Sequence, residues 1–212
     1  MANRAILFVD GNNWYHSLRD TGVEDLGRLD YARISQKLVG PRQWTGTRYY
    51  IGRVRQKGDP QLYAGQRRFL SQLGSTDGRI TCHLGRLETR TVKNDAASEL
   101  KRYLSGLRTR IDRTVFHSLM DIARRHQSTE VLVEKAVDVM LAVEMVVMAE
   151  RDQFDAAYLL SADGDFTPAV EAVRSHDKKV YVASPARGAQ LARKATAFIT
   201  LTTDWFVDCY RV

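Results

Sequence analysis

Short apolar runs alternate along the chain with segments in which apolar residues recur at helical spacing. The run AILFVD (5–10) is followed by a glycine and two asparagines, which predicts a buried strand and then a sharp turn. The same reasoning predicts further strands over 47–54, 79–88, 154–165, 178–184 and 197–201. Helical spacing predicts helices over 30–38, 60–73, 95–127, 130–150, 167–176 and 188–195, with a short helix at the end of the chain.

This alternation is typical of an α/β fold, in which helices cover both faces of an open, mostly parallel sheet. No Gly/Ser-rich or Pro-rich linker and no internal repeat interrupts it, so we expect a single domain over 1–212. The stretch at about 95–130 is basic and helical, and we interpret it as an insertion. The segment 130–150 is apolar almost all round, which predicts a buried helix.

The composition is that of an ordinary globular protein, with 44% hydrophobic and 27% charged residues among 212. The chain contains no run of about 18 apolar residues and no recognisable signal peptide. We therefore expect a cytoplasmic protein without a membrane span. Cys82 and Cys209 lie far apart, which excludes a disulfide framework and a cysteine zinc site and suits two buried thiols in a reducing compartment.

The net charge of +7 is a weak indication of a polyanionic partner, and its distribution is more informative. Residues 42–68 carry seven Lys or Arg against Asp59 alone, and residues 90–127 carry nine against four acids. Such a surface can neutralise the phosphates of a nucleic acid. The alternative is a solvated surface that happens to be rich in arginine. The candidate phosphate contacts are Arg53, Arg102 and Arg108.

Two of the predicted strands end in acidic residues. Asp10 ends the first, and Asp163 and Asp165 end the strand predicted over 154–165. Because right-handed crossovers bring the carboxyl ends of parallel strands to one edge of a sheet, we expect these acids to be neighbours. Asp138 lies in an apolar run, where a buried carboxylate is costly unless it is paired. A divalent cation, Mg²⁺ or Mn²⁺, would offset this cost and the repulsion among the acids.

Each acid also has a purely structural alternative. Asp10 or Asp165 could cap the helix that follows it, and Asp138 could pair with a buried Arg or Lys. Glu144 lies six residues after Asp138, so it could reach the other acids only from the flank of its helix.

Three polar residues beside the acids are candidates for orienting water, a carboxylate or a phosphate: Asn13, Ser161 and Thr167. Asn13 follows Asp10 by about one helical turn, where its amide could hold a carboxylate or the scissile phosphate. The hydroxyls of Ser161 and Thr167 could equally serve in turns and caps.

Three motifs carry a resemblance to a known family. Residues 10–15 (DGNNWY) resemble the opening motif of NYN-domain proteins, the LabA-like group of PIN-like nucleases. Residues 135–139 (KAVDV) resemble that family's K-G-x-D motif, and residues 161–168 (SADGDFTP) resemble its S-x-D-x-D-F motif. They occur in the family's order with compatible spacing, and the resemblance covers about 5–55 and 130–205.

The resemblance implies a PIN-like (Rossmannoid) α/β fold, an Mg²⁺ or Mn²⁺ site and cleavage of RNA. It implies polar roles for Asn13 and Ser161. Catalytic and metal-binding roles are implied for Asp10, Asp138, Asp163 and Asp165. The chain departs from the family at Ala136, where Gly is usual, and at Glu144, where Asp is common. The stretch at 95–130 is longer than the family leads us to expect, and it could be a lid, an RNA-gripping arm or an element that forms a homodimer.

We therefore expect a metal-dependent endoribonuclease. Single-stranded RNA is the favoured substrate, because a flexible strand can thread to a recessed acidic cluster, and DNA stays open. One alternative is a non-catalytic, regulatory RNA-binding module on the same fold. Another is a small-molecule phosphohydrolase of HAD type, against which Asn12 stands where that class has a second Asp. A P-loop enzyme is disfavoured because its G-x-x-x-x-G-K-[ST] motif is absent from the sequence.

Overall fold

The computed structural model describes residues 3–54 and 59–211. Their contacts divide the chain into two compact units, one formed by residues 1–86 with 134–212 and the other by residues 87–133. The predicted helical insertion at 95–130 falls within the second unit. That the chain makes up one domain stays a prediction.

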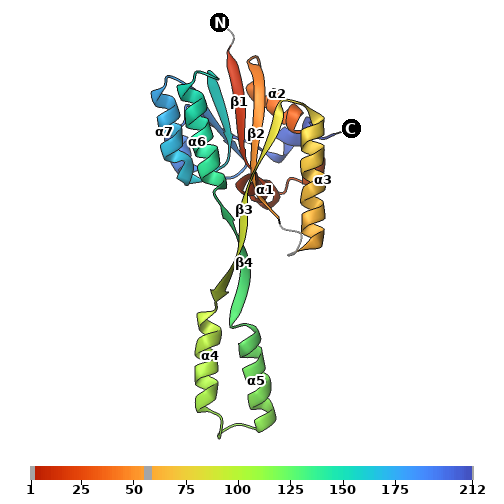
Figure 1. The fold of residues 1–212 in the computed structure, drawn as a ribbon, viewed down its shortest axis with the longest axis vertical. Helices are drawn as coiled ribbons and strands as arrows, with labels where there is room; N and C mark the ends of the chain where they lie inside the picture. Colours follow the sequence, from red (N-terminus) through yellow and green to blue (C-terminus); the bar gives the residue numbers. More distant parts are fainter. Residues whose placement is uncertain (1–2, 55–58, 212) are drawn as a thin grey trace. The chain divides into compact units, whose positions relative to one another are not determined.

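The first unit is built on a sheet in which β1 is central (Figure 1). The strand order is β4-β3-β2-β1-β5-β6-β7. The pairs β3–β2, β2–β1, β1–β5, β5–β6 and β6–β7 are all parallel. The strands are β1 (Arg4–Asp10), β2 (Gln43–Arg53), β3 (Ile80–Lys93), β4 (Ser128–Lys135), β5 (Ala156–Leu160), β6 (Lys179–Ser184) and β7 (Ala197–Thr200). The predicted α/β class with an open, mostly parallel sheet is confirmed.

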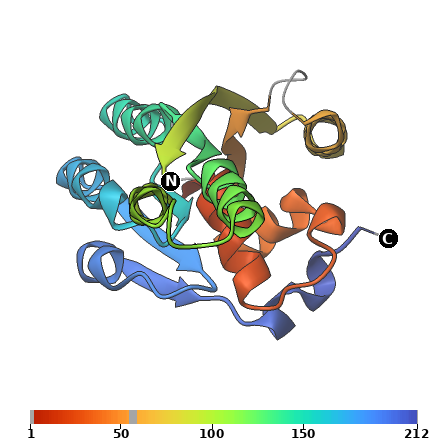
Figure 2. The ribbon, with the colours of Figure 1, turned by 90° about the horizontal axis from the view of Figure 1, so that it is seen from below.

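Helices cover both faces of this sheet, as Figure 2 shows end-on. One face carries α6 (Val137–Glu150), α7 (Thr167–Ser175) and α8 (Ala189–Lys194). The other carries α1 (Gly11–Asp20), α2 (Tyr31–Val39), α3 (Pro60–Thr76) and the 3₁₀ helix η3 (Thr203–Cys209). Further 3₁₀ turns are η1 (Leu26–Arg28) and η2 (Gly164–Phe166).

The alternation along β1 explains why the sheet has two cores. Leu7 and Val9 pack on the α1 and α2 side, whereas Ile6 and Phe8 pack on the α6 and α7 side. Successive side chains of a strand point to opposite faces, so a strand that is apolar at every position is buried on both. This is the pattern of a central parallel strand.

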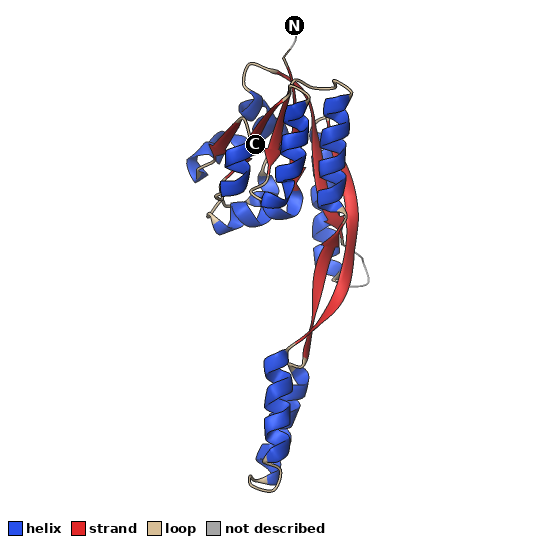
Figure 3. Cartoon of the chain, turned by 90° about the vertical axis from the view of Figure 1, so that its left-hand side faces the viewer, coloured by secondary structure: helices blue, strands red, loops and turns tan. Residues whose placement is uncertain are grey.

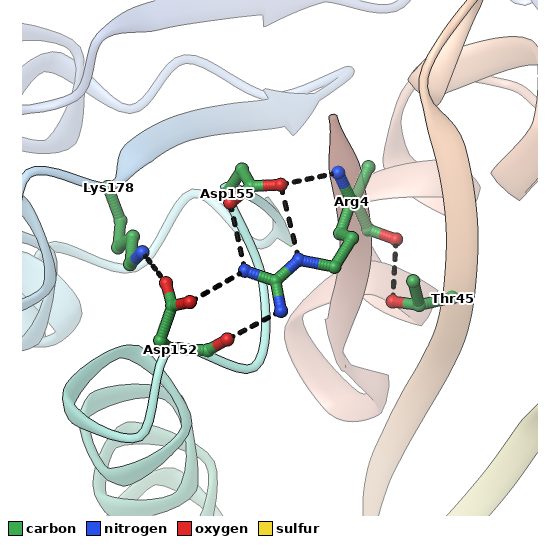
Figure 4. Close-up of polar contacts among 6 residues, drawn as sticks. Arg4, Thr45, Asp152, Asp155 and Lys178 are labelled. Atoms are coloured by element: carbon green, nitrogen blue, oxygen red, sulfur yellow. Dashed lines mark hydrogen bonds and ion pairs between the residues drawn. The ribbon is translucent and has the colours of Figure 1, made fainter. Parts of the chain in front are cut away.

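Arg4, the first residue of β1, forms hydrogen bonds at the amino ends of the parallel strands (Figure 4). The backbone N–H of Arg4 donates to Asp155 at 2.7 Å, and its guanidinium donates to both Asp155 and Asp152. Lys178 pairs with the same Asp152. The bonds from Arg4 lower the pKa of the Asp155 carboxyl. These contacts join the starts of β1, β5 and β6 and so help to fix their register.

From β1, the strands β2 to β4 follow one another toward one edge of the sheet, and β5 to β7 follow one another toward the other edge. The chain places β2 on one side of β1 and β5 on the other, and Val9 lies opposite Leu160 in the β1–β5 register. In open α/β sheets ligands bind outside the carboxyl ends of the strands at such a switch point. The residues that follow Val9 and Leu160 therefore occupy the position where a site is expected.

Three predicted elements differ from the structure. The helix predicted over 95–127 is divided into two, α4 (Asp95–Gly106) and α5 (Arg113–Arg125). The single helix predicted over 130–150 is wrong at its start, because β4 runs to Lys135 and α6 begins only at Val137. Ala136 between them has a left-handed backbone with φ of 70°, which no regular helix or strand adopts. Residues 11–20, for which the sequence analysis predicts a sharp turn with a helix capped by Asp10 as the alternative, form α1. Among the described residues, no helix is long and apolar enough to cross a membrane.

The second unit contains α4 (Asp95–Gly106) and α5 (Arg113–Arg125), two helices joined by a short turn (Figure 3). Leu104 of α4 and Met120 and Ala123 of α5 form its small buried core. Phe116 and Leu119 pack against this core and remain partly exposed.

Candidate functional site

Asp10 ends β1 and is buried, with 3% of its surface exposed, where the chain turns into α1. Its Oδ1 accepts a hydrogen bond from the backbone N–H of Asn13 at 3.3 Å, which caps α1. Its Oδ2 accepts one from the Ser161 hydroxyl at 2.9 Å. The capping role is therefore real, and it coexists with a contact to the end of the neighbouring strand.

Gly11 allows this turn to lie close to the next strand. A Cβ on Gly11 would stand 2.6 Å from the carbonyl oxygen of Tyr50, far inside van der Waals contact. The ring of the buried Tyr49 would also stand 2.6 Å from this Cβ, so the turn that positions Asp10 requires glycine.

Asn13 and Ser161 tie the two loops of the site together. Asn13 Oδ1 accepts from the backbone N–H of Ala162 at 3.0 Å, which joins α1 to the segment after β5. The Ser161 oxygen, besides donating to Asp10, accepts from the backbone N–H of Asp163 at 3.1 Å. Both residues therefore orient backbone and carboxylate groups of the site.

Asp163 and Asp165 lie in the turn that leads into α7. Asp163 Oδ1 accepts from the backbone N–H of Asp165 at 3.0 Å and caps η2. The Thr167 hydroxyl donates to the carbonyl of Gly164 at 2.6 Å, which is a turn contact. Asp165 is exposed, and no side-chain bond caps α7, so the alternative in which Asp165 caps that helix is wrong.

Asp138 lies in the first turn of α6 and is exposed, which corrects the expectation that it is buried. Partial desolvation raises the pKa of its carboxyl, and the charges of Asp163 and Asp165 raise that pKa further. Among the ion pairs of the described residues, none joins a Lys or Arg to Asp138. The alternative of a buried ion pair is therefore unsupported.

The carboxylates lie within electrostatic reach of one another. Burial raises the pKa of Asp10 to about 6, the hydrogen bonds from Ser161 and Asn13 oppose that rise, and the charges of Asp138 and Asp163 add to it. Acids from β1, from the start of α6 and from the turn after β5 thus repel one another at one edge of the sheet.

This donor set has the chemistry of a site for a hard divalent cation. Carboxylate oxygens are the ligands that Mg²⁺ and Mn²⁺ prefer. A cation would offset the cost of burying charge, which is the main cause of the two raised pKa values, and the repulsion that adds to it. Within residues 3–54 and 59–211, no group of three or more acidic, His or Cys side chains stands in a metal-holding arrangement. The carboxylate oxygens therefore fit such an ion chemically, and the aspartate side chains would have to move closer together to coordinate it.

Glu144 lies in a different polar cluster. Its Oε2 accepts from the Tyr50 hydroxyl at 2.7 Å, and its carboxylate lies 3.4 Å from Arg48 Nε and 3.5 Å from His83 Nδ1. Tyr50 and His83 stack with ring centroids 4.7 Å apart. Burial raises the pKa of Tyr50 and lowers that of His83. This carboxylate is held by partners on β2 and β3.

This second cluster borders the acids, because Asp10, Tyr50 and His83 are consecutive partners across β1, β2 and β3. The sequence analysis assigns no role to Tyr50 and counts Arg48 only among the basic residues that could neutralise phosphates. The signal was present in the alternation of polar side chains at two-residue spacing on both strands, at positions 48 and 50 and at positions 81 and 83.

The basic residues expected to hold phosphates divide into two groups. Arg42 donates to the Tyr158 and Tyr181 hydroxyls, and Arg48 donates to Thr81, so both serve the fold. Arg53 is exposed at the end of β2. Lys57 and Arg55 lie outside the described residues. The remaining candidates, Arg102 and Arg108, are exposed in the second unit.

The parallel sheet, its switch point at β1 and the acids at its carboxyl edge define the class as a PIN-like, Rossmannoid α/β protein. The family model described as NYN domain matches residues 4–202, nearly the whole chain, so this protein belongs to the NYN-domain family. NYN domains are a family of PIN-like nucleases.

One solved structure shows the same fold. It is the crystal structure of a protein of unknown function from Vibrio parahaemolyticus, 18% identical in sequence, with a TM-score of 0.56. The alignment covers 95% of this chain and 94% of that one. None of the curated proteins compared with this chain matches it.

Proposed function

We propose that this protein is a metal-dependent endoribonuclease whose site is the acidic cluster at the carboxyl edge of β1 and β5. The observation that carries the proposal is the buried Asp10 carboxylate at the end of β1, which accepts from Ser161 after β5. Asp138 and Asp163, from two further segments, lie close enough for their charges to raise its pKa. An edge that raises the pKa of its own carboxyl groups is unfavourable for the fold alone, and such perturbation is typical of functional sites. Membership of a nuclease family supports the same conclusion.

In this proposal the four carboxylates hold one or two Mg²⁺ or Mn²⁺ ions: Asp10, Asp138, Asp163 and Asp165. The bound ion would supply Lewis acidity toward the phosphate and an activated water. Ser161 and Asn13 keep the Asp10 carboxylate and the loop after β5 in one arrangement. Thr167 supports the turn that carries Asp163 and Asp165.

The favoured substrate is single-stranded RNA. Asp10 is recessed at the end of β1, whereas Asp138 and Asp165 are exposed. A flexible single strand can bring one phosphate to such a partly recessed group more easily than a stiff duplex can. Exposed arginines, among them Arg53, would neutralise neighbouring phosphates.

The test is cleavage of labelled single-stranded RNA and DNA in Mn²⁺, Mg²⁺ or EDTA by the wild type and by the variants Asp10→Asn and Asp163→Asn. Asp204→Asn is the matched control, because Asp204 is an exposed acid in η3 that takes no part in the contacts of the four proposed metal-binding acids. We expect metal-dependent cleavage of RNA by the wild type and the control, and its loss in both site variants.

Two outcomes would contradict the proposal. Binding of RNA without cleavage, unchanged in the site variants, would favour the regulatory RNA-binding module instead. Cleavage that survives both site substitutions would remove the acidic cluster from the mechanism.

A further inference from the structure

The turn between α4 and α5 carries a dense group of positive charges. Residues 101–113, which we call the hairpin tip, contain five Lys or Arg and one acid, Asp112. The basic residues are Lys101, Arg102, Arg108, Arg110 and Arg113, and the four arginines are all exposed. All belong to the second unit, so the tip can be considered by itself.

These positive charges lack an acidic partner. The Asp112 side chain accepts from the backbone N–H groups of Thr114 and Val115 at 2.8 and 3.1 Å, where it caps α5. Those bonds lower the pKa of the Asp112 carboxyl, so its charge is committed to the helix. No ion pair of the described residues includes a cation of the tip.

Several arginines of the first unit are instead engaged in contacts within the fold. Arg4, Arg48 and Arg79 all form ion pairs with carboxylates. Arg42 donates to two tyrosine hydroxyls in the sheet. Unpaired like charges repel one another and oppose the folded arrangement, and a bound polyanion would remove that repulsion. The contrast favours a ligand role for the tip over a structural one.

The backbone of the hairpin tip is held by hydrogen bonds and by a buried side chain. The backbone N–H of Leu107 donates to Leu104 at 2.9 Å, and that of Arg110 donates to Leu107 at 2.8 Å, so two consecutive turns connect the helices. The Leu104 side chain is buried in the small core between α4 and α5. The cations therefore project from a defined turn, which reduces the entropy lost when they bind phosphates.

An exposed aromatic ring completes the arrangement. Tyr103 follows Arg102 in α4 and has 66% of its surface exposed, which is unusual for a large aromatic side chain. Cations together with an exposed ring match a single strand, whose phosphates bind the cations and whose bases stack on the ring. A duplex offers the phosphates and keeps its bases inaccessible to stacking.

We propose that the hairpin tip binds single-stranded nucleic acid, with the arginines on successive phosphates and Tyr103 stacked on a base. The proposal rests on the proposed function only for the class of ligand. Binding at the tip requires neither the acidic cluster nor a metal ion.

The test measures binding of a labelled single-stranded RNA to the full chain in EDTA, where no metal-dependent cleavage takes place. Arg108→Gln/Arg110→Gln removes two charges from the tip. Its matched control is Arg151→Gln/Lys179→Gln, which removes two exposed charges after the end of α6 and at the start of β6, outside both basic stretches. We expect the tip variant to lose on the order of tenfold in affinity. The slope of log K against log salt concentration should be smaller in magnitude by about 1.4 for the tip variant. The affinity and the slope of the control should stay close to those of the wild type.

Tyr103 gives a second, uncharged readout. Tyr103→Ala should weaken binding about fivefold or more, and Tyr103→Phe, which keeps the ring, should bind like the wild type. Because the side chain is exposed, both variants should melt at the wild-type temperature. Duplex RNA of the same length should bind the wild type and Tyr103→Ala equally.

Equal losses in the tip variant and the control, or none in the tip variant, would overturn the proposal. So would a dimer, detected by sedimentation, that the tip variant dissociates while its RNA affinity stays unchanged. Cleavage assays in Mn²⁺ separate this proposal from the proposed function. If the tip variants bind RNA normally while the wild type cleaves it, the proposal for the tip is refuted and the nuclease proposal stands. If the wild type binds RNA through the tip without cleaving it, the nuclease proposal is refuted and the proposal for the tip stands.

Discussion

Asp10→Asn should stabilise the metal-free protein, although it removes a central residue of the proposed site. Burial raises the pKa of Asp10 from 3.8 to about 6, so the folded state binds this proton more tightly than the unfolded state does. A folded pKa above the unfolded one means that stability is highest below pH 4 for this group and falls as the pH rises through about 6. A shift of about two units corresponds to about 3 kcal/mol, which is the upper limit of the gain.

The neutral amide can keep the local hydrogen bonds. Asparagine Oδ1 can accept from Asn13 as the carboxylate does, and its NH₂ group can donate to the Ser161 oxygen. We therefore expect most of the gain to appear above pH 7 and to disappear near pH 4, where wild-type Asp10 is protonated.

Denaturant unfolding in EDTA at pH 4, 6 and 8 measures this difference, with Asp204→Asn as the control for a general change of charge. An excess of Mn²⁺ at pH 8 should stabilise the wild type and leave Asp10→Asn unchanged, because only the wild type binds the ion at this residue. A variant that is less stable than the wild type by the same amount at every pH would refute the reasoning. It would mean that the hydrogen bonds of Asp10 outweigh the cost of its buried charge.

Three further predictions concern the neighbours of Asp10. Asp138→Asn should abolish metal-dependent cleavage and lower the pKa of Asp10, because its charge contributes to that shift; an NMR titration that finds the pKa unchanged would contradict this. Tyr50→Phe should cost about 1–2 kcal/mol in denaturant unfolding, since it removes the hydroxyl that donates to Glu144, and a cost near zero would show that Arg48 and His83 suffice. Gly11→Ala should cost about 1–3 kcal/mol by the same assay, because the added Cβ would press on backbone, whereas the control Gly27→Ala, which meets open space, should be near neutral.

The features that the sequence predicts well are those that local rules decide. Apolar runs that end in acids predict β1 and β5, and the rule for parallel strand ends predicts that Asp10 and Asp163 are neighbours, close enough for the charge of one to raise the pKa of the other. The Ser161 hydroxyl orients a carboxylate, as the sequence suggests, because it donates to Asp10. The Asn13 amide contacts no carboxylate among the described residues and accepts from the backbone N–H of Ala162 instead.

The features that the sequence missed depend on neighbours distant in the chain. The run VLV at 131–133 has no periodicity that separates a strand from a helix, and only the left-handed Ala136 shows where β4 ends. Because Asp138 was assigned to the middle of a longer helix, it was expected to be buried, whereas it lies in the exposed first turn. The partners of Arg42 and Glu144 come from strands far away in sequence, so no local pattern could reveal that both are engaged in the fold.

Within the second unit, the α4–α5 segment begins and ends at almost one point. The backbone N–H of Asn94 donates to the carbonyl of Gln127 at 2.9 Å, so the two ends of the α4–α5 segment are in direct contact. A segment closed in this way can change in length, charge or sequence without changing the spacing of the residues that flank it. The arrangement is modular. Evolution, or a protein engineer, could exchange residues 95–126 for a different recognition element, or for a short turn, while the acidic edge of the sheet keeps its geometry.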